Sequence, residues 1–296
     1  MNNSPLLVSV TIAPKHERDW EELVEALARL SAGAPGLRVS DLDVIGGAQA
    51  LLEAASEERL REIVARFQEL SPVEAIIGPP RVAYRERLSR RQEIDFTHKR
   101  PGQYARVKLV FDTDGAGGEI FENRAPEKSI PAEFVDGVER GVVSVVESGV
   151  LLGCPVVELK AALVDGAGHG SDSSVLAFEI AARAATREAL ARSSELLEPI
   201  MSVETVAPDD VAEAVIEDLR GRRAEALKSE QGDERTRIAA TAPLAELLGY
   251  GEALGSLTKG RASYNLRFSH YAPTAPTDDT PFRPAAAARS SAAVRQ

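Results

Sequence analysis

A loop rich in glycine and serine, residues 165–174, contains the residue types best suited to bind a ligand. It reads DGAGHGSDSS and precedes a helical pattern. Glycines expose the backbone, and free N–H groups at a helix start attract negative oxygen, so this loop could hold a phosphate. The same residues fit an ordinary turn with an Asp or Ser helix cap, and composition alone favours that simpler interpretation.

His169 lies in the middle of this loop, where an imidazole can donate a hydrogen bond to a 2′-hydroxyl or a base edge. A lone loop histidine usually has no function, so we assign no general base. His16, His98, His270 and Cys154 lack the spacing of metal ligands. We therefore predict no metal and no cofactor, and we expect Cys154 to be a small buried apolar residue.

A second candidate is the run HKRPGQY, residues 98–104, in which cations and a tyrosine flank a Pro-Gly turn between two extended segments. Cations at a hairpin tip can meet phosphates, although a solvated turn explains these residues equally well. Arg85, Arg87, Arg90 and Arg91 add a basic stretch that is either a contact strip or a contribution to solubility.

Nucleotide hydrolysis is not expected, because no G-x-x-x-x-G-K-[S/T] sequence is present to cradle phosphates and hold Mg²⁺. The chain has 296 residues with a formal charge of −11, so any RNA contact must be local rather than a general electrostatic coating. Its single cysteine and its short, interrupted apolar runs predict a cytosolic protein that does not span a membrane.

The hydrophobic periodicity predicts the same architecture near both ends of the chain, which is a ferredoxin-like βαββαβ sandwich. Near the amino terminus we expect strands at 6–12, 37–39, 48–53 and 73–77, with one helix from residue 19 and another capped by Ser56. Near the carboxyl terminus we expect strands at 201–206, 224–228, 236–242 and 262–268, with helices at 208–221 and 244–254.

The central block has a different order, with strands before helices. We expect strands at 94–99, 104–111, 119–123 and 156–164, and helices at 131–147 and 174–191. This order predicts an α+β sandwich. Residues 274–296 are rich in Pro, Ala, Thr, Ser and Arg and are predicted to form a disordered tail.

Collinear segments along most of the chain resemble translation elongation factor G. They are VEAIIGPPRVAYRE (73–86), FTHK (96–99), GQYA (102–105), SGVL (148–151), PVV (155–157), DSS (172–174), AF (177–178), LEPIM (197–201), PLAE (243–246), GY (249–250), KGRAS (259–263) and HY (270–271). The resemblance covers the third, fourth and fifth domains of that factor. The GTPase domain and the second domain have no counterpart in it.

The resemblance implies two ferredoxin-like domains, residues 1–82 and 200–273, flanking a ribosomal protein S5-like domain, residues 83–199. In the family the central domain enters the ribosomal decoding site, and the histidine matched by His169 contacts the codon–anticodon helix. The residues implied to contact RNA are Gly168, His169, Gly170, Ser171, Asp172 and Ser173 in the loop, and His98, Lys99, Arg100 and Gln103 in the hairpin.

Two features depart from the family pattern. Only Arg100 and Pro101 join Lys99 to Gly102, where the family carries a glycine-rich insertion. Gly168 and Gly170 replace an aromatic and an acidic residue that are usual beside the histidine, which makes this loop costlier to order.

The leading hypothesis is a translation factor that binds rRNA, and tRNA or mRNA at the decoding site, through shape and local polar contacts rather than catalysis. A separate translational GTPase would then supply GTP hydrolysis, and the chain would modulate elongation or ribosome occupancy. One alternative is a small-molecule kinase of S5-like fold that uses the loop for phosphate. Another is a diverged scaffold that no longer binds the ribosome.

Overall fold

The structure, a computed structural model, describes residues 5–44, 47–113, 119–126, 128–151 and 153–274. The chain divides into two compact units: one contains the segment up to Ala83 together with Glu198–Ala272, and the other is built on Tyr84–Leu197. The three domain boundaries expected from the sequence stay predictions. Of the predicted disordered tail, residues 275–296 lie outside the described residues, whereas Thr274 closes a strand.

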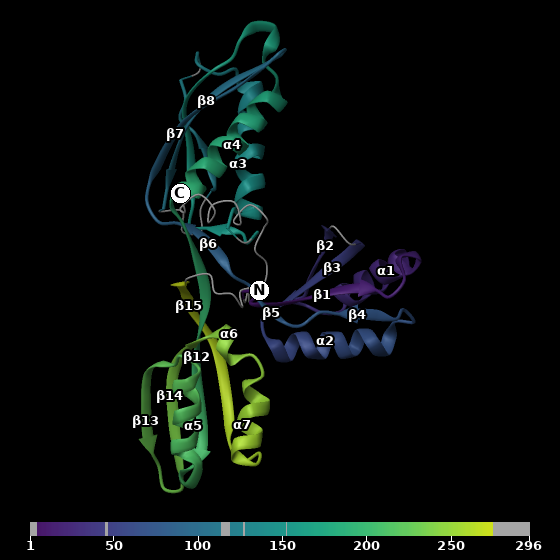
Figure 1. Cartoon of the computed structure of the whole chain (residues 1–296), viewed down its shortest axis with the longest axis vertical. Helices are drawn as coiled ribbons and strands as arrows, with labels where there is room; N and C mark the ends of the chain where they lie inside the picture. The colour runs from purple at the N-terminus through teal and green to yellow at the C-terminus, as the bar shows by residue number, and fades with distance from the viewer. Residues whose placement is uncertain (1–4, 45–46, 114–118, 127, 152, 275–296) are drawn as a thin grey trace, which may run out of the picture. The chain divides into compact units, whose positions relative to one another are not determined.

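The first module has the predicted βαββαβ order (Figure 1). Its elements are β1 (Val8–Pro14), α1 (Trp20–Ala32), β2 (Arg38–Val44), β3 (Gly47–Ala54), α2 (Glu57–Leu70) and β4 (Ala75–Ile77). The strands form an antiparallel sheet in the order β2-β3-β1-β4, and the short β5 (Arg81–Val82) also pairs with β1. Helix α2 begins where the sequence predicts, because the Ser56 hydroxyl accepts the Arg59 N–H at 3.2 Å.

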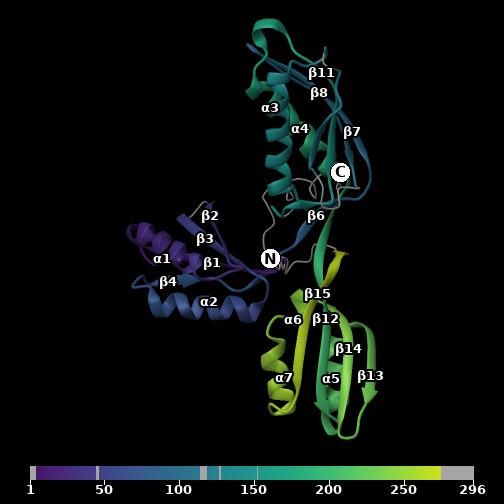
Figure 2. The same ribbon diagram turned by 180° about the vertical axis from the view of Figure 1, so that it is seen from behind.

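The last module repeats this topology. It contains β12 (Ser194–Pro208), α5 (Asp209–Gly221), β13 (Glu225–Gln231), β14 (Arg235–Pro243), α6 (Leu244–Leu247), α7 (Tyr250–Thr258) and β15 (Ser263–Thr274). The strand order is β13-β14-β12, with β15 on the other side of β12. Both views show α5 and α7 against one face of these strands (Figures 1 and 2).

The prediction of one continuous helix over residues 244–254 is wrong. The segment forms two helices separated by Leu248 and Gly249, and Gly249 has a φ of 73°, in the left-handed region that favours glycine. The break places the Tyr250 side chain in the core, with its hydroxyl 2.9 Å from the Thr205 Oγ1. Burial of this tyrosine and its polar tip therefore outweighs the local preference for an unbroken helix.

The central unit is an α+β sandwich, as predicted. Its elements are β6 (Arg85–Leu88), β7 (Gln92–Arg100), β8 (Gln103–Asp112), β9 (Phe121–Asn123), α3 (Ala132–Ser148), β10 (Val156–Val157), β11 (Lys160–Ala167) and α4 (Val175–Ser193). The main sheet has the order β7-β8-β11-β9. The predicted single strand over 156–164 is instead split at Glu158, whose φ is 56°, because β10 pairs with β6 and β11 pairs with β8.

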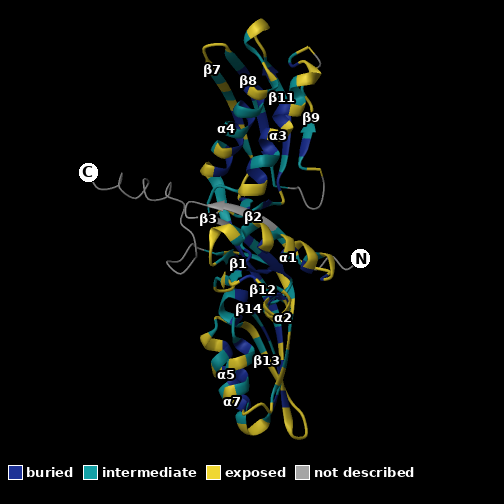
Figure 3. Ribbon diagram, turned by 90° about the vertical axis from the view of Figure 1, so that its right-hand side faces the viewer, coloured by how far each residue is buried: buried dark blue, intermediate teal, exposed yellow. Residues whose placement is uncertain are grey.

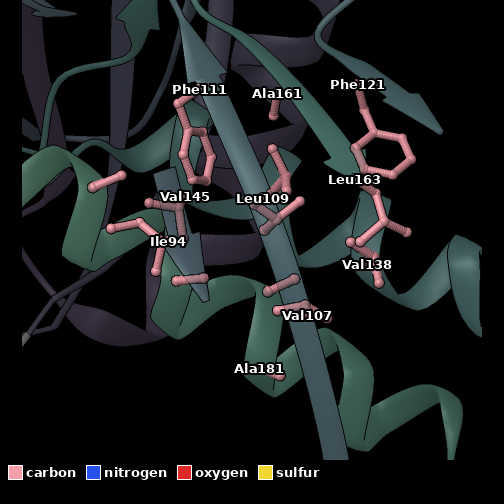
Figure 4. Close-up of a cluster of buried hydrophobic side chains, with 14 of the residues drawn as sticks. Ile94, Val107, Leu109, Phe111, Phe121, Val138, Val145, Ala161, Leu163 and Ala181 are labelled. Atoms are coloured by element: carbon pink, nitrogen blue, oxygen red, sulfur yellow. The ribbon is translucent and has the colours of Figure 1, made fainter. Parts of the chain in front are cut away.

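Helices α3 and α4 lie side by side on one face of the main sheet, and the core fills the space between them and the strands (Figures 1 and 4). Val107, Leu109 and Phe111 of β8 point into this core, as do Val138 and Val145 of α3. Small residues let the two helices approach closely: a Cβ built on Gly141 would lie 2.5 Å from the Glu179 carbonyl oxygen. The other face of the sheet has no helix of the described chain packed on it and carries mainly polar side chains.

Candidate RNA interface at the tip of the central sheet

The β7–β8 hairpin ends in a two-residue turn. Arg100 and Gln103 form its last pair, and Pro101 and Gly102 make the connection. Gly102 has a φ of 70°, and Pro followed by a left-handed Gly is the signature of a type II turn. The tight turn predicted from the sequence is therefore present, and it is exposed at the free end of the sheet (Figure 3).

The glycine-rich loop joins β11 to α4 and is held by its own hydrogen bonds. The His169 carbonyl accepts the N–H groups of Asp172 at 2.8 Å and Ser173 at 3.2 Å. The Ser174 hydroxyl caps α4 by accepting the Ala177 N–H at 3.1 Å, as predicted for a serine at this position. The loop itself occupies the N–H groups of Asp172, Ser173 and Ala177, so these three are not free to bind a phosphate.

The loop and the hairpin meet through Ser173. Its hydroxyl donates to the Tyr104 carbonyl at 2.8 Å and accepts the His169 N–H at 2.7 Å. The rings of Tyr104 and His169 make an edge contact, with centroids 6.2 Å apart and an interplanar angle of 66°. Two segments that the sequence presents as separate candidates thus form one surface.

The strand register explains which side chains share that surface. Strands β8 and β11 pair Arg106 with Ala167, beyond a bulge between Leu163 and Asp165. The ladder ends at Ala167, and two residues further on the His169 ring makes its edge contact with the Tyr104 ring, while Lys99 is paired with Tyr104 on the other side. Directly opposed residues face the same way, so Lys99 and Tyr104 share the open face of the sheet, and the ring contact adds His169 to them. We call these three side chains the tip row.

Behind the tip row, the open face neutralises its own charges. Arg106 donates to Asp95 at 2.8 Å and to Asp165 at 3.1 Å, and Lys108 lies 2.7 Å from Glu93. We call these five side chains the paired face. The Arg106 hydrogen bond holds the pKa of Asp95 below its usual range, and the Lys108 hydrogen bond does the same for Glu93. In contrast, Lys99 and Arg100 make no ion pair with any described residue.

The predicted site residues in the loop are accessible. Gly168, His169, Gly170 and Ser171 are exposed, and the His169 side chain retains 73% of its accessible surface. Asp172 and Ser173 are half-buried; one Asp172 carboxylate oxygen lies 3.8 Å from the His169 Nδ1. The loop is therefore not packed inside the protein. Its expected contact with RNA requires this exposure.

The predicted hairpin residues are divided between the two faces of the sheet. Lys99 is on the open face, whereas His98, Arg100 and Gln103 alternate to the other face, where the His98 Nε2 lies 3.0 Å from the Gln103 Oε1. The sequence analysis includes Tyr104 in the candidate run of residues 98–104 but not among the residues implied to contact RNA. The signal that could have selected it is an aromatic residue across the Pro-Gly turn from the cations of the hairpin.

Other candidates from the sequence fall elsewhere. Arg87 is bound to Glu195 at 2.6 Å and Arg91 lies 3.4 Å from Asp112, so two members of the basic stretch are ion-paired. Cys154 is half-buried rather than fully buried, and burial raises the pKa of its thiol to about 11. In the part of the chain that the structure describes, no group of three acidic, His or Cys side chains could hold a metal, and no helix is long and apolar enough to cross a membrane.

Two family models match consecutive parts of the chain. Residues 80–194 match "Elongation factor G, domain IV" and residues 195–280 match "Elongation factor G C-terminus". The chain belongs to the elongation factor G family. Neither matched model is that of a GTPase domain. The first module lies outside both matched ranges, so the assignment of this module as a third domain stays a prediction.

A solved structure adds a relative of known coordinates. The chain is similar to the protein ttk003000868 from Thermus thermophilus, seen in a crystal structure, with 34% sequence identity and a TM-score of 0.65. The match covers 93% of this elongation factor G family chain and 42% of that chain. The chain thus spans less than half the length of this relative.

Proposed function

We propose that this chain is a ribosome-binding translation factor of the cytoplasm, and that the tip row contacts structured RNA at the decoding site. One observation carries the proposal: a cation, a phenol ring and an imidazole stand in line at the exposed end of a sheet, while the paired face behind them is neutralised. The unpaired charge and the aromatic surface of the open face are therefore concentrated at its end.

The chemistry of the tip row suits RNA. A-form RNA presents a wide, shallow minor groove lined by 2′-hydroxyls, which the exposed imidazole of His169 and the exposed hydroxyl of Ser171 can contact. Lys99 can meet a phosphate, and the Tyr104 ring offers a surface for an unstacked base. Because the whole chain carries a charge of −11, such contacts must be local, which agrees with their confinement to one end.

Binding rather than catalysis is the proposed activity. The chain would modulate elongation or ribosome occupancy by placing its tip against rRNA, tRNA or mRNA, without any cofactor. No step in this role consumes energy in the chain itself, so directional movement would need GTP hydrolysis by a separate translational GTPase.

Cosedimentation of the full chain with ribosomes at physiological salt tests the proposal. Lys99→Ala combined with His169→Ala should weaken binding about tenfold or more, because a phosphate contact and a groove contact are lost together. The matched control is Lys108→Ala, which removes a lysine of the same strand pair that is bound to Glu93, and it should leave binding within about twofold.

The remaining outcomes separate the alternatives. A wild-type chain that stays in the supernatant, with and without a GTP-loaded partner factor, would contradict ribosome binding. Unchanged binding of the double variant would indicate a scaffold that uses another surface. Thermal stabilisation by ATP, about 2.7 kcal/mol at a hundredfold excess over the dissociation constant, would instead support the kinase alternative.

A further inference from the structure

Two adjacent serines end the glycine-rich loop, and the structure uses them differently. The Ser174 hydroxyl accepts the Ala177 N–H and caps its own helix, α4. The Ser173 hydroxyl points the other way and bonds a carbonyl that is 69 residues distant in the sequence, that of Tyr104 at the start of β8. Ser174 therefore serves local helix formation, and Ser173 serves the tertiary placement of the loop.

The Ser173 side chain uses its donor and one acceptor position in the same bridge. It gives its proton to the Tyr104 carbonyl at 2.8 Å and takes the His169 N–H at 2.7 Å. Its backbone N–H also donates to the His169 carbonyl at 3.2 Å. His169 is thus held to Ser173 through both its backbone N–H and its backbone carbonyl, and Ser173 is held to the hairpin.

The neighbouring glycine fits this bridge closely. A Cβ built on Gly168 would lie 3.1 Å from the Ser173 Oγ and 3.5 Å from the Ser173 Cβ. A side chain at position 168 would therefore press on the bridging hydroxyl. The glycine allows this close approach, whereas a side chain would require Ser173 to shift by a few tenths of an ångström.

We infer that Ser173 is a positioning residue, whose hydroxyl holds the His169 loop against the β7–β8 hairpin so that Lys99, Tyr104 and His169 meet RNA as one preformed surface. The inference deepens the proposed function, and its consequence for binding rests on that function. Without the bridge, the loop of exposed glycines would have to be ordered at the moment of binding, which weakens the complex.

Amide hydrogen exchange of the full chain, measured by NMR, tests the bridge without reference to the ribosome. In Ser173→Ala the His169 N–H should exchange about three- to tenfold faster, the effect of one lost hydrogen bond, while the Ala177 N–H keeps its rate. Ser174→Ala is the matched control and should show the reverse. Ser173→Thr keeps the hydroxyl and should restore protection of His169. Equal exchange of the His169 N–H in the wild type and Ser173→Ala would overturn the inference.

A double-mutant cycle on ribosome affinity tests the consequence. Ser173→Ala should weaken binding about fivefold with Ser174→Ala near the wild-type value, and His169→Ala should matter less in the Ser173→Ala background than alone. Additive losses would show that Ser173 does not act through His169 and would overturn the positioning role. If exchange responds as expected but neither His169→Ala nor Ser173→Ala changes binding, the bridge stands and the proposed function fails.

Discussion

The tip row and the paired face occupy the same open surface of the same sheet and differ in one respect. On the paired face, each of the five charged side chains has an opposite charge within reach, for example Arg106 between Asp95 and Asp165. In the tip row, Lys99 has no ion-pair partner among the described residues, and the nearest carboxylate to the His169 ring is that of Asp172, at 3.8 Å. The Tyr104 ring carries no charge to be paired. Under the proposed function this difference places RNA contact at the tip row, because neutralised pairs offer a polyanion little net attraction.

Loss of the scaffold under both regions gives the largest expected effect. Phe178 is fully buried and stacks on Phe134 with ring centroids 4.9 Å apart. Phe178→Ala should lower the free energy of unfolding by about 3–5 kcal/mol, because it leaves a cavity beneath the sheet. Urea unfolding measures this, with Leu176→Ala as the control: Leu176 lies on the same helix but is 55% exposed, so its loss should stay within about 0.5 kcal/mol. Similar losses for both variants would contradict the packing described.

Removal of the ring in the tip row should come next in size. Tyr104→Ala should reduce ribosome affinity by about 1–3 kcal/mol, the usual contribution of a base stacked on an aromatic side chain. Tyr104→Phe keeps the ring and should bind nearly as well as the wild type. Ribosome cosedimentation over a concentration series gives both values. If Tyr104→Phe fails as badly as Tyr104→Ala, the hydroxyl and not the ring face makes the contact.

Salt should separate the two lysines of the open face. Lys99→Ala should lower the slope of log affinity against log salt by about 1, because one phosphate contact and its released counterion are lost. Lys108→Ala should leave the slope unchanged, since its ammonium group is already bound to Glu93. Binding measured between low and moderate salt checks this difference. An equal change for both lysines would remove the distinction between the two regions.

Acid should affect the paired face by the smallest amount. The pKa of Asp95 is lowered in the folded chain, chiefly by its hydrogen bond from Arg106. This bond contributes stability above the ordinary Asp pKa of about 4, and the contribution is lost as the pH falls through the lowered value. Because the pair is exposed, the contribution should stay well below about 1 kcal/mol. Arg106→Ala should therefore flatten the dependence of unfolding free energy on pH between about 5 and 2, and an unchanged dependence would show that the pair contributes nothing.

Much of the fold is predictable because it depends on local signals. Helix α2 begins at its Ser56 cap, and both outer modules follow the strand and helix order that hydrophobic periodicity indicates. The loop and the hairpin could each be recognised as candidates from glycine, cation and aromatic content. These features lie within a few residues of sequence, so no knowledge of distant contacts is needed.

The placement of the site depends on long-range structure and was not predictable. From Lys160 to Leu163, β11 pairs with β8 in one register, and from Asp165 onward the pairing is shifted by one residue. Without this bulge Asp165 would lie opposite Val107 instead of Lys108 and would face the other side of the sheet, away from Arg106. No residue type near Val164 signals the shift. The bridge from Ser173 to Tyr104 was equally hidden, because it joins positions 69 residues apart.

The short Pro101–Gly102 connection makes the hairpin a suitable place to insert longer loops. A Cβ built on Gly102 meets no atom within 4 Å, so extra residues at this point would project into empty space rather than displace the sheet. Grafting loops of graded length between Arg100 and Gln103 would turn the hairpin into a molecular ruler. The length at which ribosome association changes would report how closely the end of the sheet approaches its target.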